Sequence, residues 1–233
     1  MRQEPGTRHG RRALHLAVAG AALAAGGAGC AARPAPRAEP AASTAPAAAV
    51  ALVDVGALDA SLTLDMRYAR PDNFLGRAMY DAARCLLVED AAGRLLAADA
   101  ALRATGYRLV VWDCYRPRSV QAAMWAILPD PTYVADPAKG SRHNRGAAVD
   151  VGLLALDGSA VPVPTAHDDF SPQAHRDATD LPAEAIANRE RLERAMVTAG
   201  WLPLASEWWH FDAPGWEAYP LRDDPLTTAD VAD

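Results

Sequence analysis

Residues 147–156 read AAVDVGLLAL, an apolar run that contains a single charged side chain, Asp150. A run of this kind predicts a buried strand. Asp157-Gly158 follows it and predicts a tight turn, and residues 160–163 are then expected to form the return strand of a hairpin. Working outward, residues 107–113 (YRLVVWD) form a second short run with β-branched side chains, which predicts another central strand.

Helices are predicted where helix-favouring residues run up to a glycine or begin after a proline. These segments are 89–105 before Gly106, 119–128 after Pro117, and 182–199 before Gly200. Further strands are predicted at 62–68 and 207–212, with a proline-rich loop at 129–142. This mixture predicts an α+β fold: a single domain with a central, mainly antiparallel sheet flanked by helices.

The first 49 residues are expected to lie outside this domain. Arginines precede an apolar run from Ala13 to Ala28, which is the layout of a secretory signal peptide and is too short for a stable membrane span. Small residues then precede Cys30, as in a bacterial lipoprotein signal, so residues 1–30 are either simply cleaved or leave Cys30 lipidated as a membrane tether. Residues 31–49 are rich in Ala and Pro and predict a linker. We therefore expect an exported protein, periplasmic or lipid-anchored at the cell envelope.

Charge and cysteine content narrow the function classes. The formal net charge is −6, and loss of residues 1–29, which carry four Arg and one Glu, would take it to −9. An acidic domain is a poor candidate for binding nucleic acid through its phosphates. Cys85 and Cys114 remain in the domain, where they form either a disulfide in an oxidising compartment or two buried thiols. Neither has a second cysteine at metal-binding spacing, so a thiolate zinc site is not expected.

Two short stretches, SRHNRGAAVD and EWWH, supply the residue types of a catalytic zinc site. These residues are His143, Asp150, Glu207 and His210. Such a site needs three protein ligands, an open position for water and a nearby carboxylate that takes a proton from that water. Each residue alone would more often be structural, but the combination in two compact apolar segments predicts a site. His167 and His175 lie in a polar stretch, where we expect them to be exposed or to support the ligands from outside.

Strand geometry restricts how these side chains can converge, because positions an odd number apart on a strand point to opposite faces. His143 and Asp150 are seven apart, and Glu207 and His210 are three apart. Both pairs converge only if the regular strand is broken between them. Residues 144–146 (NRG) offer such a break, and Glu207 would have to lie before the last strand begins.

With these motifs in view, the sequence resembles the VanX-type D-alanyl-D-alanine dipeptidases among the zinc D,D-peptidases. The resemblance runs from about Asp65 to Phe211. The family signature S-x-H-x-x-G-x-A-x-D matches residues 141–150, and its E-x-W-H motif matches 207–210. A Y-A-x-x-D-N-F segment matches residues 68–74, and a W-D-x-Y-R-P segment matches 112–117. We find no departure at a catalytic position.

The resemblance implies a catalytic role for each matching residue. One zinc ion per chain would be bound by His143, Asp150 and His210. Glu207 would act as general base toward the water and then protonate the departing amine. Arg116 would stabilise the oxyanion of the tetrahedral intermediate, although alone it would be taken for an ordinary surface arginine.

The resemblance also implies substrate contacts. A dipeptidase must recognise a free amino terminus, and Asp169 resembles the ammonium-binding aspartate of the family, with Asp168 as the alternative one position away. Ser141 would either bind the substrate carboxylate or brace its own loop, and Tyr68 is a further substrate-binding candidate.

The function implied is zinc-dependent hydrolysis of a small partner, the D-Ala-D-Ala dipeptide, to two D-alanines in peptidoglycan metabolism. One alternative is a zinc D,D-carboxypeptidase that trims terminal D-Ala from wall peptides, and another is a non-catalytic wall-binding lipoprotein. Residues 50–233 would form the dipeptidase domain. Export favours recovery of dipeptide released outside the membrane over removal of a cytoplasmic precursor. Two imidazoles and a carboxylate also accept divalent ions other than zinc.

Overall fold

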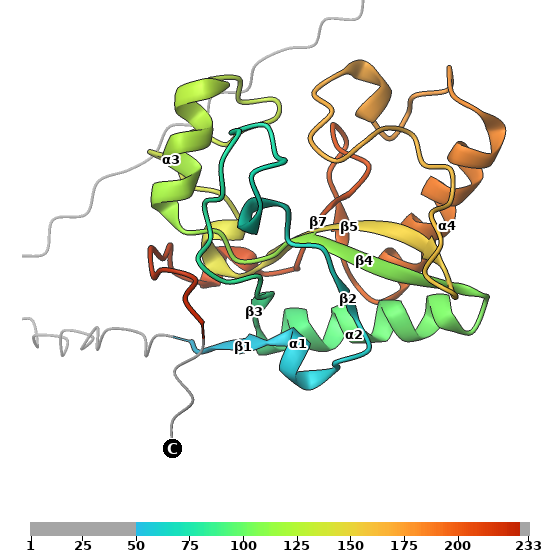
Figure 1. Ribbon diagram of the computed structural model, residues 1–233, viewed down its shortest axis with the longest axis horizontal. Helices are drawn as coiled ribbons and strands as arrows, with labels where there is room; N and C mark the ends of the chain where they lie inside the picture. The colour runs from blue at the N-terminus through green and yellow to red at the C-terminus, as the bar shows by residue number, and fades with distance from the viewer. Residues whose placement is uncertain (1–49, 229–233) are drawn as a thin grey trace, which may run out of the picture. The chain divides into compact units, whose positions relative to one another are not determined.

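The structure is a computed structural model that describes residues 50–228 (Figure 1). The expected signal peptide at 1–30 with Cys30, and the linker at 31–49, lie outside the described residues. Between residues 50 and 228, none of the helices combines the length and apolarity that crossing a membrane requires.

A five-stranded sheet forms the centre of the fold, in the order β2-β4-β5-β7-β6. Its strands are β2 (Thr63–Leu64), β4 (Tyr107–Asp113), β5 (Ala148–Ala155), β7 (His210–Asp212) and β6 (Leu202–Pro203). β2 runs parallel to β4, and the other three pairings are antiparallel. A separate two-stranded sheet pairs β1 (Leu52–Asp54) with β3 (Leu86–Val88). The predicted α+β fold with a mainly antiparallel sheet is confirmed.

The helices are α1 (Val55–Leu58), α2 (Glu89–Arg103), α3 (Arg118–Ile127) and α4 (Ala183–Thr198). Figure 1 shows α2 running beneath β4 and β5, with α3 on the opposite side of the sheet. The three long helices match the predicted ones to within two residues at each end. Short 3-10 turns lie at Arg67–Ala69, His143–Arg145, Pro172–Ala174 and Trp216–Ala218.

The core lies between α2 and the lower face of the sheet. Leu95 of α2 and Leu109 and Val111 of β4 are fully buried. Burying a side chain of this size contributes about 1.5–3 kcal/mol each. On the opposite face, Trp112 lies across β5 at Gly152, where a Cβ would come within 2.4 Å of the indole ring. The glycine therefore allows a large aromatic side chain to lie flat on the sheet.

Three predicted strands are wrong in extent. The strand predicted at 207–212 is β7, which begins only at His210 because the chain turns at Glu207. The strand predicted at 62–68 ends as β2 at Leu64, because the chain then turns and the Asp65 carboxylate pairs with Arg67 and Arg70 at 2.9 and 2.6 Å. The return strand predicted at 160–163 is reduced to one bridge between Leu154 and Ala160. Pro162 and Pro164 have no N–H to donate to a ladder, which prevents the longer pairing.

Cys85 and Cys114 form a disulfide with an S–S distance of 2.02 Å. It joins the residue before β3 to the residue after β4. Of the two alternatives left open by the sequence, the disulfide is therefore the one present in the structure.

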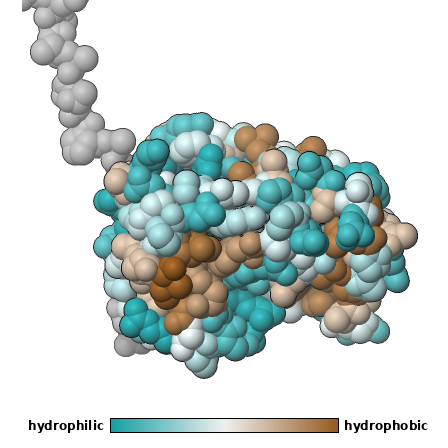
Figure 2. All heavy atoms as spheres, turned by 90° about the horizontal axis from the view of Figure 1, so that it is seen from above, coloured by the Kyte–Doolittle hydropathy of each residue, from teal (hydrophilic) through white to brown (hydrophobic). Residues whose placement is uncertain are grey.

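The surface carries no single dominant apolar area in the view of Figure 2, where apolar atoms lie in separate patches with polar atoms between them. The large exposed apolar side chains of the described residues come from widely separated parts of the chain: Val50, Leu58, Ile127, Leu156, Val197 and Leu202. Single exposed side chains of this kind are usual in soluble domains and identify no binding surface.

Candidate active site

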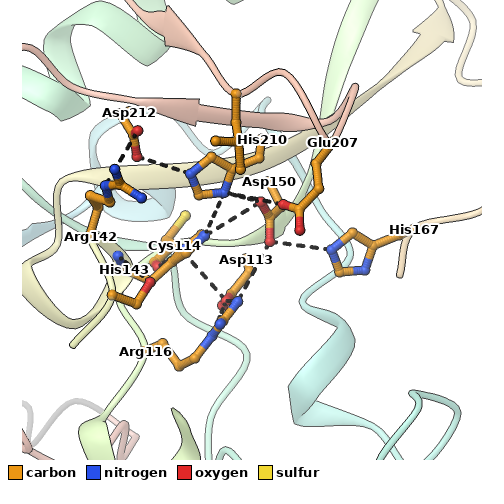
Figure 3. A network of polar contacts seen from close by, with 12 residues as sticks. Asp113, Cys114, Arg116, Arg142, His143, Asp150, His167, Glu207, His210 and Asp212 are labelled. Atoms are coloured by element: carbon orange, nitrogen blue, oxygen red, sulfur yellow. Dashed lines mark hydrogen bonds and ion pairs between the residues drawn. The ribbon is translucent and has the colours of Figure 1, made fainter. Parts of the chain in front are cut away.

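Three predicted ligands meet at one point of the sheet (Figure 3). His143 Nε2 lies 3.1 Å from His210 Nδ1, and Asp150 Oδ1 lies 3.0 Å from His210 Nδ1 and 3.4 Å from His143 Nε2. Ligand atoms about 2.0–2.1 Å from a tetrahedral zinc ion are separated from one another by about 3.3 Å. The three donor atoms therefore have the spacing of one face of a zinc tetrahedron, and all three residues are buried.

Local structure explains how the three side chains converge. Asp150 on β5 and His210 on β7 are register partners in an antiparallel pair, so their side chains lie on the same face. His143 reaches that face because a 3-10 turn over His143–Arg145 ends at Gly146, whose φ is +65°. The break predicted at 144–146 is present, and the left-handed conformation explains why a glycine follows it.

The second nitrogen of each imidazole is held by the protein. His143 Nδ1–H donates to the carbonyl oxygen of Cys114 at 2.7 Å, and His210 Nε2–H donates to Asp212 Oδ1 at 2.9 Å. These bonds direct His143 Nε2 and His210 Nδ1 at the shared point, where each would ligate a metal ion that takes the place of its proton. Arg142 Nε lies 3.6 Å from the other oxygen of Asp212.

The electrostatics of this point favour a cation. Burial lowers the pKa of His210, but hydrogen bonds to Asp150 and Asp212 outweigh it and raise the pKa to about 10. Burial raises the pKa of Asp150, but His143 and the other two imidazoles lower it well below its usual value. A site that stabilises positive charge in this way suits a divalent metal ion, so the residues present fit zinc.

Glu207 lies in the turn before β7, as convergence with His210 requires. Its Oε2 is 3.8 Å from His210 Nδ1, and the residue is 6% exposed. Burial, helped by the nearby Asp150 and Asp168 carboxylates, raises the pKa of Glu207 to about 8. Its carboxylate lies beside the ligand cluster and lines the cavity, which is the place of a group that takes a proton from a water molecule and later returns it, as a general base that becomes a general acid must do.

Arg116 is buried rather than on the surface. Its guanidinium donates to Asp113 Oδ2 from Nε at 2.9 Å and to Gln121 Oε1 from Nη1 at 2.9 Å. Nη2 is 3.7 Å from Asp150 Oδ2, and the guanidinium lies over the ring of Tyr68. Burial opposes its charge, but Asp113 raises the pKa well above its ordinary value, so a fixed positive charge faces the ligand cluster.

A cavity of about 100 Å³ opens beside the ligand cluster. The predicted site residues that line it are Tyr68, Arg116, Ser141, His143, Asp150, Glu207 and His210. Aromatic contacts enclose it, since the ring of Phe170 lies 5.1 Å from that of Phe74 and 5.4 Å from that of Tyr133. A metal site, a base, a fixed cation and a small enclosed volume thus occur together.

Asp168 lines the cavity, whereas Asp169 does not. Asp168 has a φ of +60°, the one non-glycine positive value among residues 50–228, and its carboxylate accepts from the Tyr68 hydroxyl at 2.9 Å. Burial raises the pKa of Asp168. Of the two aspartates considered for the substrate amine, Asp168 is therefore the one at the cavity: a left-handed turn, which costs about 1–2 kcal/mol for a non-glycine residue, aims its carboxylate there. Nothing in the Asp-Asp pair of the sequence reveals that turn.

Ser141 lies where it could both brace its own loop and contact a substrate, the two roles considered for it. Its Oγ accepts from the backbone N–H of His143 at 3.2 Å, which braces the ligand loop. It also lines the cavity, where its own hydroxyl hydrogen is not used by that bond. His175 lies apart from the ligands, with Nε2 3.3 Å from the hydroxyl of Tyr133.

His167 supports the ligands from outside and is not exposed. Its side chain is 3% exposed, with Nε2 3.3 Å from Asp150 Oδ2. Burial lowers its pKa, but Asp168 and Asp150 outweigh that effect and raise it. In the sequence, the polar residues around His167 give no sign of this burial. It arises because the loop folds back and brings the imidazole against Trp112 on the sheet.

The comparisons with known proteins agree with this geometry. A family model described as D-ala-D-ala dipeptidase matches residues 48–227. The D-alanyl-D-alanine dipeptidase of Escherichia coli K12 is 37% identical over 176 residues, which cover 76% of this chain and 91% of that protein. The enzyme of the same name from Enterococcus faecium is 32% identical, covering 69% and 86%, and that of Streptomyces coelicolor is 31% identical, covering 73% and 91%. The chain therefore belongs to the D-ala-D-ala dipeptidase family.

Proposed function

We propose that this protein is a zinc-dependent dipeptidase that hydrolyses D-Ala-D-Ala to two D-alanines. The observation that carries the proposal is one small cavity in which the ligand triad, Glu207, Arg116 and Asp168 converge. When held by the triad, zinc supplies a Lewis acid that polarises the scissile carbonyl and acidifies a water molecule.

Proton transfer falls to Glu207. Its carboxylate, close to His210 and facing the cavity, takes a proton from the attacking water and returns it to the departing amine. Arg116 places a permanent charge near the carbonyl oxygen, where negative charge develops. Removing one such group costs about 10²–10³-fold in rate in other enzymes.

Asp168 favours a dipeptide over a longer wall peptide. The free ammonium of a dipeptide can pair with this buried carboxylate, which the Tyr68 hydroxyl already holds in place. A wall peptide carries an amide at the same position, has no charge to offer the carboxylate and would lose this interaction. Phe74, Tyr133 and Phe170 form one wall of the cavity and narrow the space beside the ligand cluster, which favours a small substrate. These features favour the dipeptidase over the carboxypeptidase, and an intact Glu207 with three ligands disfavours a non-catalytic binding protein.

We propose further that the protein is exported and acts in the periplasm or on a lipid anchor at Cys30. The basic and apolar leader supports this proposal, and so does the Cys85–Cys114 disulfide, since disulfides persist in oxidising compartments. Fractionation of cells that express the full chain tests it. Membrane-bound protein that becomes soluble in Cys30→Ser supports the anchor, soluble periplasmic protein in both supports simple cleavage, and cytoplasmic protein contradicts export.

Release of D-alanine from D-Ala-D-Ala tests the activity, with N-acetyl-D-Ala-D-Ala and a muramyl pentapeptide as competing substrates. We expect chelator-sensitive cleavage of the free dipeptide, a loss of about 10²–10⁴-fold in kcat for Glu207→Gln, and a higher KM for Asp168→Asn. The matched variant Asp169→Asn should keep the original KM. Preferential cleavage of the pentapeptide would instead support a D,D-carboxypeptidase. Zinc binding without turnover of any substrate would support a non-catalytic wall-binding protein.

A further inference from the structure

The loop between β5 and α4 carries a buried histidine that the proposed reaction does not use. His167 approaches Asp150 on the side away from His143 (Figure 3). Its Nε2 lies 3.3 Å from Asp150 Oδ2, and its Nδ1 lies 3.4 Å from Asp168 Oδ2. One imidazole thus contacts both a metal ligand and the carboxylate proposed to bind the substrate amine.

Aromatic side chains fix the orientation of this imidazole. Its centroid lies 5.2 Å from that of Trp112, 5.5 Å from that of Trp209 and 6.1 Å from that of Tyr68. Trp112 is itself seated against Gly152 on the sheet. Rings packed on several sides hold the plane of the imidazole, so its polar edge stays between Asp150 and Asp168.

The contact with Asp150 determines which oxygen of that carboxylate faces the metal position. Oδ1 faces the two ligand imidazoles, whereas Oδ2 faces His167 Nε2 at 3.3 Å and Arg116 Nη2 at 3.7 Å. Donation from His167 Nε2–H to Oδ2 holds the plane of the carboxylate and presents Oδ1 alone. Partners that orient a ligand in this way typically contribute about 10–100-fold to metal affinity or activity.

The contact with Asp168 acts on the other half of the site. Asp168 is held in a left-handed turn, and its carboxylate is bound by the Tyr68 hydroxyl from one side and faced by His167 Nδ1 from the other. We propose that His167 is a positioning residue for both halves of the site: its Nε2–H donates to Asp150, the metal ligand, and its ring, with Nδ1 left as an acceptor, packs beside Asp168 and limits where that carboxylate can lie for the substrate amine. The Asp168 half rests on the proposed dipeptidase function, whereas the Asp150 half does not.

Three substitutions in the full chain separate the two contacts. His167→Phe keeps the aromatic packing and removes both nitrogens. His167→Gln places an amide N–H near the former Nε2, and His167→Asn places an amide oxygen, an acceptor, near the former Nδ1. His175→Gln is the matched control, since this histidine contacts neither carboxylate. The measurements are the zinc Kd of the metal-free protein by competition with a chromogenic chelator, its thermal unfolding, and KM and kcat for D-Ala-D-Ala at saturating zinc.

We expect His167→Phe to raise the zinc Kd about 10–100-fold and KM roughly tenfold, with thermal unfolding of the metal-free protein little changed. His167→Gln should restore the zinc Kd but not KM, and His167→Asn should restore KM but not the zinc Kd. An unchanged zinc Kd in His167→Phe overturns the proposal, and so does a loss that His167→Gln fails to restore, because the role would then be packing alone. The zinc Kd tests the contact with Asp150 even if the chain is inactive on the dipeptide. Failure of this proposal can therefore be told apart from failure of the proposed function.

Discussion

Reduction of the Cys85–Cys114 disulfide is expected to lower the stability of the domain substantially. The two cysteines are fully buried and 29 residues apart. In the chain-entropy model, closing a loop of this length restricts the unfolded chain by about 3.6 kcal/mol at 25 °C. For a domain of this size each kcal/mol shifts the unfolding temperature by about 2–4 °C, so reduction should lower Tm by about 7–14 °C.

The same disulfide bears on the metal site. The carbonyl oxygen of Cys114 accepts from His143 Nδ1–H. The backbone N–H of Arg116, two residues further along, donates to the carbonyl oxygen of His143 at 3.1 Å. Loosening the chain at Cys114 therefore weakens the support of one zinc ligand. We expect the reduced protein to bind zinc more weakly, by no more than the roughly 10–100-fold that such support contributes elsewhere.

Thermal unfolding of the metal-free chain, with and without a phosphine reductant, measures the first effect, and thiol titration verifies the redox state. The double variant Cys85→Ala with Cys114→Ala is the control, because its Tm should not respond to the reductant. Reduced and oxidised chains that unfold within about 2 °C of each other would refute the loop-entropy reasoning. Equal zinc affinity of the oxidised and reduced chains would refute only the proposed coupling between the disulfide and His143, and would leave the stability argument standing.

Further predictions concern the sheet and the ligand support. Gly152→Val should destabilise the domain by about 1–3 kcal/mol, because the new side chain meets the Trp112 ring. Gly93→Ala in α2 should instead stabilise it by up to about 1 kcal/mol, because no atom lies within 4 Å of the new Cβ. Chemical denaturation measures both changes in the free energy of unfolding. Asp212→Ala should raise the zinc Kd about 10–100-fold, since His210 Nε2–H loses its acceptor, and chelator competition measures this; an unchanged Kd would show that Asp212 does not orient the ligand.

The sheet centre could be predicted because local and tertiary preferences agree there. The strand predicted at 107–113 is β4 with the same bounds, and that predicted at 147–156 is β5 with one residue less at each end. In the segment 160–163 they disagree, since apolar residues alternate with prolines that cannot donate to a ladder. The apolar pattern was therefore a poor guide to pairing at that edge.

The candidate metal ligands could be singled out because their residue types stand together in two short motifs that resemble the family signature. The turn at 144–146 and the β5–β7 register then bring them together despite their odd spacing. Asp168 and His167 could not be placed in the same way. Their positions depend on a left-handed backbone conformation at a non-glycine residue and on a loop that folds over Trp112. Neither feature leaves a periodic signal in the sequence, so the polar composition of 165–180 left exposure of His167 and support of the ligands from outside as open alternatives.

This difference separates the two parts of the site physically. Asp150 and His210 are fixed by hydrogen-bonded strands, including the bond from Val151 N–H to the Trp209 carbonyl at 3.0 Å, so the metal position follows from the sheet itself. Asp168 lies on a loop outside that ladder and depends on side-chain contacts with Tyr68 and His167 for its position. Changes in this loop can therefore alter which amine-bearing substrate is accepted without moving the metal. His167 contacts both parts, so a substitution at this position would alter the support of the metal ligand Asp150 as well as the loop.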